Sequence, residues 1–124
     1  MKQLILGLLL LAASTAQAQQ AISQRGDTTV INTTSLTQNV RGYRGPTPLN
    51  IFVHKNKIVR IEALRNRETP KYFQMVRQQL LGAWDGMTVK KALKAEVDGV
   101  TGATLSSNAV KANVKAGLQQ LKKK

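Results

Sequence analysis

The chain of 124 residues is long enough for one domain and too short for two domains of ordinary size. It contains no cysteine, so it has neither a disulfide framework nor a thiolate metal site or nucleophile. Its only histidine, His54, cannot form a histidine-based metal cluster, and we expect neither a metal site nor catalytic residues. The formal charge of +13 favours an anionic partner, yet aromatic residues are only 4% of the chain, so a nucleic-acid partner is not expected.

The first 18 residues have the features of a secretory signal peptide. A lysine at position 2 precedes a continuous apolar run from Leu4 to Ala13, and small residues at Ala16 and Ala18 fit a cleavage site after Ala18. The apolar run is too short for a membrane-spanning helix, and no second one follows it. We therefore expect an exported protein, in the periplasm or on the outer face of the membrane, whose mature chain has no transmembrane helix.

Polar residues 19–27 predict a flexible leader, so the domain is expected to occupy residues 28–124. Residues 28–34 and 35–43 are rich in Thr, Val and Ile and predict two short strands. The clearest hairpin covers residues 49–64, where apolar and polar side chains alternate on both sides of a turn at Lys55 and Asn56.

After Pro70 the apolar residues recur at helical spacing instead of alternating with polar ones. This pattern predicts a helix over residues 71–81. Thr88 is expected to cap a second, short helix. A closing helix is predicted from Ser106 or Ser107 to about Lys122, with one apolar stripe made by Val110, Val114, Leu118 and Leu121. The predicted fold class is α+β, a mainly antiparallel sheet from the hairpin-rich N-terminal half packed with two to three helices from the C-terminal half.

Small residues and hydroxyls are concentrated in the sequence VDGVTGATLSSNAV, from Val97 to Val110, directly before the closing helix. Such a loop has two interpretations. It can be an ordinary capped loop, since Ser106 and Ser107 are good N-cap residues. Alternatively, it can hold a phosphorylated ligand, because the free N–H groups and the dipole of a helix N-terminus attract anions. Spacing alone favours the first interpretation.

The segment from Asp98 to Thr104, DGVTGAT, resembles the flavinylation motif of the FMN-binding domain family: an Asp, two variable residues, Ser or Thr, and then Gly-Ala-Thr. That family includes the covalently flavinylated subunits of the sodium-translocating NADH:quinone reductase and of the related ferredoxin-linked complex, small secreted domains, and modules of extracellular reductases. In the family a flavin transferase joins the FMN phosphate to the last threonine through a phosphoester, which implies attachment at Thr104.

Two further segments resemble the same family. GYRGP, residues 42–46, is similar to its glycine-rich segment before the hairpin, and ETP, residues 68–70, to its Glu-Thr-Pro after the hairpin. The resemblance covers the chain from about Gly42 to the end, without the anchor helix of the respiratory subunits. The cofactor-binding residues that it implies are Thr104, Ala103, Gly102, Thr101, Asp98, Leu105, Tyr43, Gly45, Glu68 and Thr69.

Several of these residues also have purely structural interpretations. Asp98 repels a phosphate, so it is expected either to brace the loop by accepting N–H bonds or to be recognised by the transferase. Tyr43 either covers the flavin ring or packs at the end of a strand. Glu68 and Thr69 are equally well explained as helix-start residues, with Thr69 as a cap.

The resemblance implies an exported, membrane-associated flavoprotein that carries FMN on Thr104 and transfers electrons between a membrane-side donor and an unknown acceptor. The expected partners are a flavin transferase and a membrane electron-donor complex or an exported reductase. We expect a redox-active electron carrier rather than an autonomous enzyme. The alternative hypothesis is a cationic binding module without flavin that attaches to an anionic surface or an acidic protein.

Overall fold

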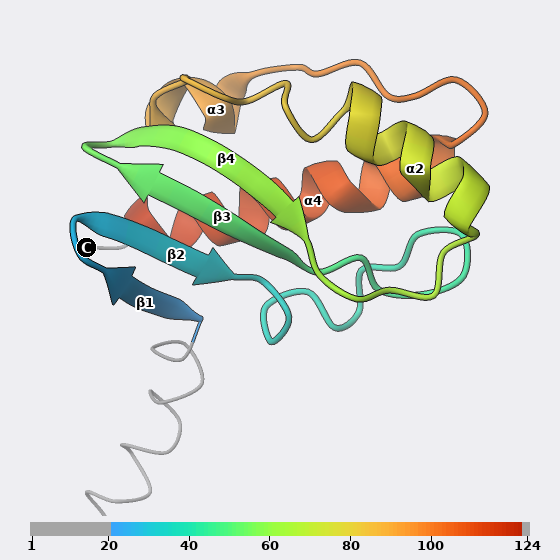
Figure 1. The fold of residues 1–124 in the computed structure, drawn as a ribbon, viewed down its shortest axis with the longest axis horizontal. Coiled ribbons are helices and arrows are strands. Elements are labelled where there is room, and N and C mark those ends of the chain that lie inside the picture. The colour runs from blue at the N-terminus through green and yellow to red at the C-terminus, as the bar shows by residue number, and fades with distance from the viewer. Residues whose placement is uncertain (1–20, 123–124) are drawn as a thin grey trace, which may run out of the picture.

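The computed structural model describes residues 21–122, which form one antiparallel sheet and three helices (Figure 1). The strand order is β1-β2-β3-β4, with neighbouring strands following each other along the chain. The strands are β1 (Ile22–Arg25), β2 (Thr28–Asn32), β3 (Leu49–His54) and β4 (Lys57–Ala63). The helices α2 (Pro70–Gln79), α3 (Val89–Lys94) and α4 (Thr104–Lys122) come from the C-terminal half, so the predicted α+β class is confirmed.

The β3–β4 hairpin forms where alternation predicts it, and its turn lies at the predicted residues. Lys55 and Asn56 have positive φ angles of 48° and 65°, as a two-residue turn of the favoured twist requires. A bulge beside Phe52 and Val53 shifts the register, so that Val53 faces Ile58 while Phe52 faces Arg60. The bulge explains how Ile58 and Ile61, three residues apart, are both buried.

One strand prediction and the prediction of a flexible leader are wrong. Ile22–Arg25, within the predicted flexible leader, forms β1 and pairs with Thr28–Ile31 of β2, so the folded domain includes part of that leader. The predicted strand over residues 35–43 is absent: the segment is made of turns and irregular backbone, with one isolated bridge from Arg41 to Pro46. The Thr37 hydroxyl donates to the carbonyl of Thr33 at 2.9 Å, and such local side-chain bonds compete with a strand ladder.

The three helices begin close to the predicted positions. Helix α2 (Pro70–Gln79) has Pro70 in its first turn and buries Phe73 and Val76. Helix α3 (Val89–Lys94) is capped by Thr88, whose side chain accepts from the N–H of Lys91 at 3.1 Å, as predicted. Helix α4 (Thr104–Lys122) begins at Thr104, two residues before the earlier of its predicted starts.

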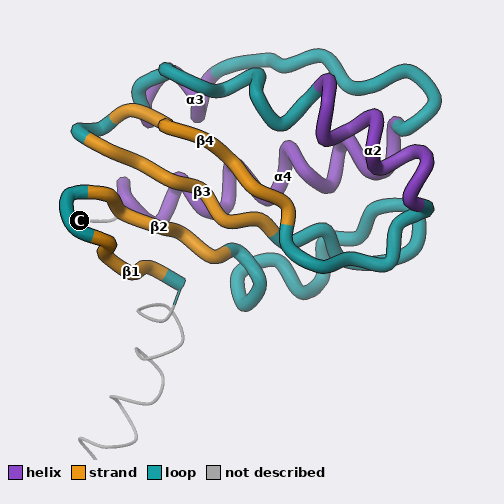
Figure 2. The backbone as a smooth tube through the Cα atoms, in the orientation of Figure 1, coloured by secondary structure: helices purple, strands orange, loops and turns teal. Residues whose placement is uncertain are grey.

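Helix α4 is the central element of the core. It lies behind the sheet in Figure 1, against β2 and β3, and both α2 and α3 pack on it (Figures 1 and 2). The predicted stripe faces inward: Val110, Val114 and Leu118 are buried and Leu121 is half-buried. No helix within residues 21–122 has the length and hydropathy needed to cross a membrane.

Candidate functional site

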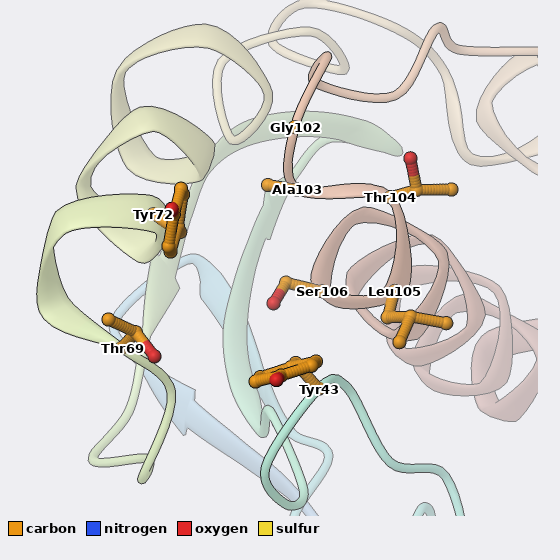
Figure 3. A pocket seen from close by; sticks show the side chains of 8 residues that line it. All are labelled: Tyr43, Thr69, Tyr72, Gly102, Ala103, Thr104, Leu105 and Ser106. Atoms are coloured by element: carbon orange, nitrogen blue, oxygen red, sulfur yellow. The ribbon is translucent and has the colours of Figure 1, made fainter.

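An open pocket of about 540 Å³ lies between the N-terminus of α4, the start of α2 and the turn that follows residue 41. It is lined by Tyr43, Thr69, Tyr72, Gly102, Ala103, Thr104, Leu105 and Ser106. In Figure 3, Tyr43 and Tyr72 stand on different sides of the hollow and Ser106 points between them. Thr104 stands at the rim on the α4 side, with its hydroxyl pointing away from Tyr43 (Figure 3). Three segments distant in sequence thus build one site.

The small residues before α4 shape one wall of this pocket. Gly102 has a φ of +86°, a left-handed conformation that other L-residues rarely adopt. The N–H of Ala103 donates to the carbonyl of Val100 at 2.9 Å, which closes a tight turn immediately before Thr104. Gly99 lies so close to α4 that a Cβ there would approach Cβ of Ser107 to 3.2 Å. The glycines therefore allow the loop to turn sharply against the first turn of the helix.

The first turn of α4 has free donors at the pocket. The position before the helix is Ala103, which has no capping oxygen, and within residues 21–122 no partner accepts from the N–H groups of Thr104, Leu105 or Ser106. Free N–H groups at the positive end of a 19-residue helix suit an anion such as a phosphate. The hydroxyl of Thr104, which is exposed, stands beside them.

Ser106 and Ser107 are not the caps that the sequence predicts. Both are buried within the first turn of α4. The Ser107 hydroxyl accepts from the N–H of Val100 at 2.9 Å, which ties the loop to the helix. The Ser106 hydroxyl instead donates to Oε1 of Glu68 at 2.6 Å. Their position inside the first turn, rather than before it, follows from the earlier start of α4.

Glu68 connects the three segments of the site. It is buried, and its Oε1 accepts from the N–H of Tyr43 at 2.7 Å as well as from Ser106. Its Oε2 accepts from the N–H of Arg44 at 2.6 Å. The approach of this carboxylate explains Gly42, since a Cβ there would lie 2.0 Å from Oε1 of Glu68. Glu68 thus fixes the turn that carries Tyr43 against α4.

Six of the ten predicted site residues line the pocket: Tyr43, Thr69, Gly102, Ala103, Thr104 and Leu105. The other four do not. Glu68 is buried and accepts from the lining residue Ser106, and the carbonyl of buried Gly45 accepts from the N–H of Gly42 at 2.8 Å. Thr101 and Asp98 are exposed, and Asp98 accepts no hydrogen bond from the described residues, so the predicted loop brace is wrong. Thr69 precedes α2, but its side chain makes no capping bond.

Sequence reasoning missed two lining residues, Tyr72 and Ser106. Tyr72 lies off the apolar stripe of α2 and is 47% exposed. An aromatic side chain on the polar side of a predicted helix could therefore have indicated a binding residue. Ser106 had no comparable signal, because its bond to Glu68 joins residues 38 positions apart.

The pocket fits a phosphorylated, partly aromatic ligand. Its volume is within the usual range for ligand sites, about 300–1,000 Å³. It combines free N–H donors with two tyrosines, and the domain around it is α+β.

A model of the family described as "FMN-binding domain" matches residues 42–119, more than half of the chain. The protein therefore belongs to the FMN-binding domain family and is a flavin-binding protein with FMN as its cofactor. Neither curated proteins nor solved structures gave a significant match.

Proposed function

We propose that the Thr104 side chain carries FMN through a phosphoester and that the protein is an exported electron carrier. The observation that supports the attachment is the position of Thr104. This last residue of the DGVTGAT motif places an exposed hydroxyl at the N-terminus of α4, beside free N–H groups and on the rim of the pocket. Oγ1 of Thr104 bonds to the FMN phosphorus of the nucleotide that the transferase supplies, the hydroxyl gives up its proton and the nucleotide releases its leaving group, so the chain gains the mass of FMN less one water.

A covalent tether suits a protein that works outside the cytoplasm. A dissociable FMN would be lost by dilution there, whereas an ester retains it permanently. The ester leaves the isoalloxazine chemically unchanged, so the surrounding residues alone tune its electronic properties. Neighbouring positive charges favour the reduced, anionic flavin, and the formal charge of +13 supplies many cations for that purpose.

Replacing the proposed acceptor tests the attachment directly. We expect Thr104→Ala, coexpressed with a flavin transferase, to give a folded and colourless protein that lacks the added mass. The exposed side chain contributes little to packing, so the free energy of unfolding should change by less than about 1 kcal/mol. Intact mass and flavin fluorescence in a denaturing gel measure the outcome.

Thr69→Ala is the matched control, because it removes a threonine hydroxyl that lines the same pocket. This variant should keep the covalent flavin. Covalent fluorescence that survives in Thr104→Ala would refute the attachment site, and loss of fluorescence in both variants would show that the substitutions act through the pocket rather than through the acceptor.

The proposed electron route runs from a membrane-side donor complex or an exported reductase, through the FMN, to an acceptor. The apolar run of residues 4–13 supports export, and the family resemblance supports the transferase and donor as partners. Reduction of the loaded protein by inverted and right-side-out membrane vesicles tests the route. Flavin bleaching only with vesicles whose outer face is accessible would support it, and no bleaching with either kind would contradict it.

A further inference from the structure

Exposed hydrophobic side chains gather at the mouth of the FMN pocket. Four large hydrophobic residues are strongly exposed within residues 21–122, and three of them line this pocket: Tyr43 at 71%, Leu105 at 55% and Tyr72 at 47%. The fourth, Val59, lies at the bulge of β4. A cluster of exposed apolar surface is unfavourable in water and marks an interaction site. The outward parts of these side chains would remain available to a partner when a cofactor occupies the pocket.

Four exposed basic residues, which we call the rim cations, lie next to residues of this pocket in the sequence. Arg41 and Arg44 flank Tyr43 in sequence, and Arg67 and Lys71 flank the segment from Glu68 to Pro70; all four are exposed. The one acid in these segments is Glu68, which is buried and has both oxygens engaged by the hydrogen bonds described above. Of the remaining acids, Asp98 is exposed and begins the loop that leads to the pocket-lining residues 102–106, whereas Asp27, Glu62, Asp85 and Glu96 lie in other segments.

The turn that carries two of these arginines is held in place. Nη2 of Arg41 donates to the carbonyl of Arg44 at 3.1 Å, and Glu68 fixes the N–H groups of Tyr43 and Arg44. None of the four cations forms a salt bridge with a described residue. They are therefore available to bind an external anionic group. Because the turn is already ordered, binding there loses less conformational entropy.

We propose that this pocket mouth is the docking surface for an acidic electron-transfer protein; the inference rests on the proposed carrier function. An apolar centre with tyrosines and a rim of arginines has the composition of a protein–protein interface. Three of the four rim cations are arginines, whose planar guanidinium pairs with carboxylates through two hydrogen bonds. A lipid surface is less well matched, because the cluster surrounds a hollow rather than a projecting face. Complementary charge also steers the partner to the cofactor.

Two double charge-reversal variants test whether binding depends on this surface or only on the net charge of the protein. Arg44→Glu/Arg67→Glu reverses two rim cations, and Lys90→Glu/Lys94→Glu makes the same change in net charge on exposed positions of α3. The probe is a plant-type ferredoxin, an acidic one-electron carrier, titrated into the flavin-loaded form of each variant and again into each variant in the Thr104→Ala background. Without flavin in that background, binding is measured independently of the attachment at Thr104.

We expect amide shifts on ferredoxin addition to concentrate at residues 41–45, 67–72 and 102–106. The Kd should rise about tenfold or more in the rim variant and less than about threefold in the α3 variant, with the difference removed by 0.5 M salt. Shifts centred elsewhere, or equal losses in both variants, would overturn the proposal. Rim-dependent binding to vesicles containing phosphatidylglycerol, without ferredoxin binding, would also overturn it in favour of a lipid surface. Failure of the flavin attachment appears separately, in the mass assay on Thr104.

Discussion

At the scale of single residues, the carboxylate of Glu68 organises the pocket without lining it. Its two oxygens accept from two backbone N–H groups and one serine hydroxyl, all in a buried environment. Hydrogen bonds to an ionised group are stronger than neutral ones, and buried donors that lose their acceptor are costly. Glu68 is thus a positioning residue that acts through the turn of Tyr43.

Glu68→Gln tests this role with little change in shape. An amide offers one acceptor oxygen where the carboxylate offers two, so either Tyr43 or Arg44 must point its N–H at an NH₂ group. We expect a loss of about 1–3 kcal/mol in the free energy of unfolding and faster hydrogen exchange at these two amides. Urea denaturation and exchange measured by NMR check both effects.

The control for this prediction is Glu62→Gln, the same chemical change at an exposed acid. Glu62 pairs with Arg60 at 3.4 Å, with both side chains about half exposed. Surface pairs of this kind contribute at most about 1 kcal/mol. Equal effects of the two substitutions on stability would show that Glu68 has no special structural role.

At the scale of elements, a buried polar network attaches the long β2–β3 connection to α4. Oδ1 of Asn113, a fully buried residue of α4, accepts from the hydroxyls of Thr33 and Thr37. Its Nδ2 donates to the carbonyl of Ala109 at 2.9 Å, and the Thr33 hydroxyl accepts from the N–H of Leu49 at 2.9 Å. The connection that ends in the Tyr43 turn is therefore fixed at its start as well.

Asn113→Ala should leave the Thr33 hydroxyl without its acceptor, restrict the Thr37 hydroxyl to the carbonyl of Thr33, and create a small cavity. We expect a loss of about 2–4 kcal/mol in the free energy of unfolding, because the cost of an unsatisfied buried hydroxyl adds to the cost of the cavity. Thermal unfolding measures it. Asn108→Ala makes the same substitution at an exposed position of the same helix and should be nearly neutral. A neutral Asn113→Ala would show that the connection does not depend on this network.

At the scale of the whole molecule, the positive charge is spread over the chain, whereas the site lies at one end. The pocket lies at one end of α4, whereas the turn of the β3–β4 hairpin and α3 lie toward the other end (Figure 1). The cations extend over the whole chain, yet the exposed hydrophobic residues concentrate at the pocket. The net positive charge keeps the protein soluble and attracts anionic partners, and we infer that the pocket mouth makes the specific contacts with a partner.

Export is the remaining prediction at this scale. The proposed signal peptide lies outside the described residues, so it is tested in the cell. We expect the secreted chain to begin at Gln19, because the small residues at 16 and 18 fit the cleavage pattern. N-terminal sequencing of the protein from the periplasmic fraction measures this. A start at Met1, or protein confined to the cytoplasm, would contradict the exported carrier.

The sequence by itself determined the features that depend on near neighbours. Alternation and two turn residues defined the β3–β4 hairpin, Pro70 marked the start of α2, and Thr88 capped α3. The DGVTGAT motif located the loop before α4, and the family match confirmed that the chain binds FMN. These signals are readable because the residues that produce them lie within a few positions of one another.

Only the tertiary structure decided which distant residues meet. β1 forms in a polar segment because it pairs with β2 across a turn at Gly26, whose φ is +62°. Ser106, Tyr43 and Glu68 meet although about 25 to 38 positions separate Glu68 from the other two. Tyr72 reaches the pocket because α2 packs on α4. Local periodicity carries no information about such contacts, since they depend on how whole elements pack around one core.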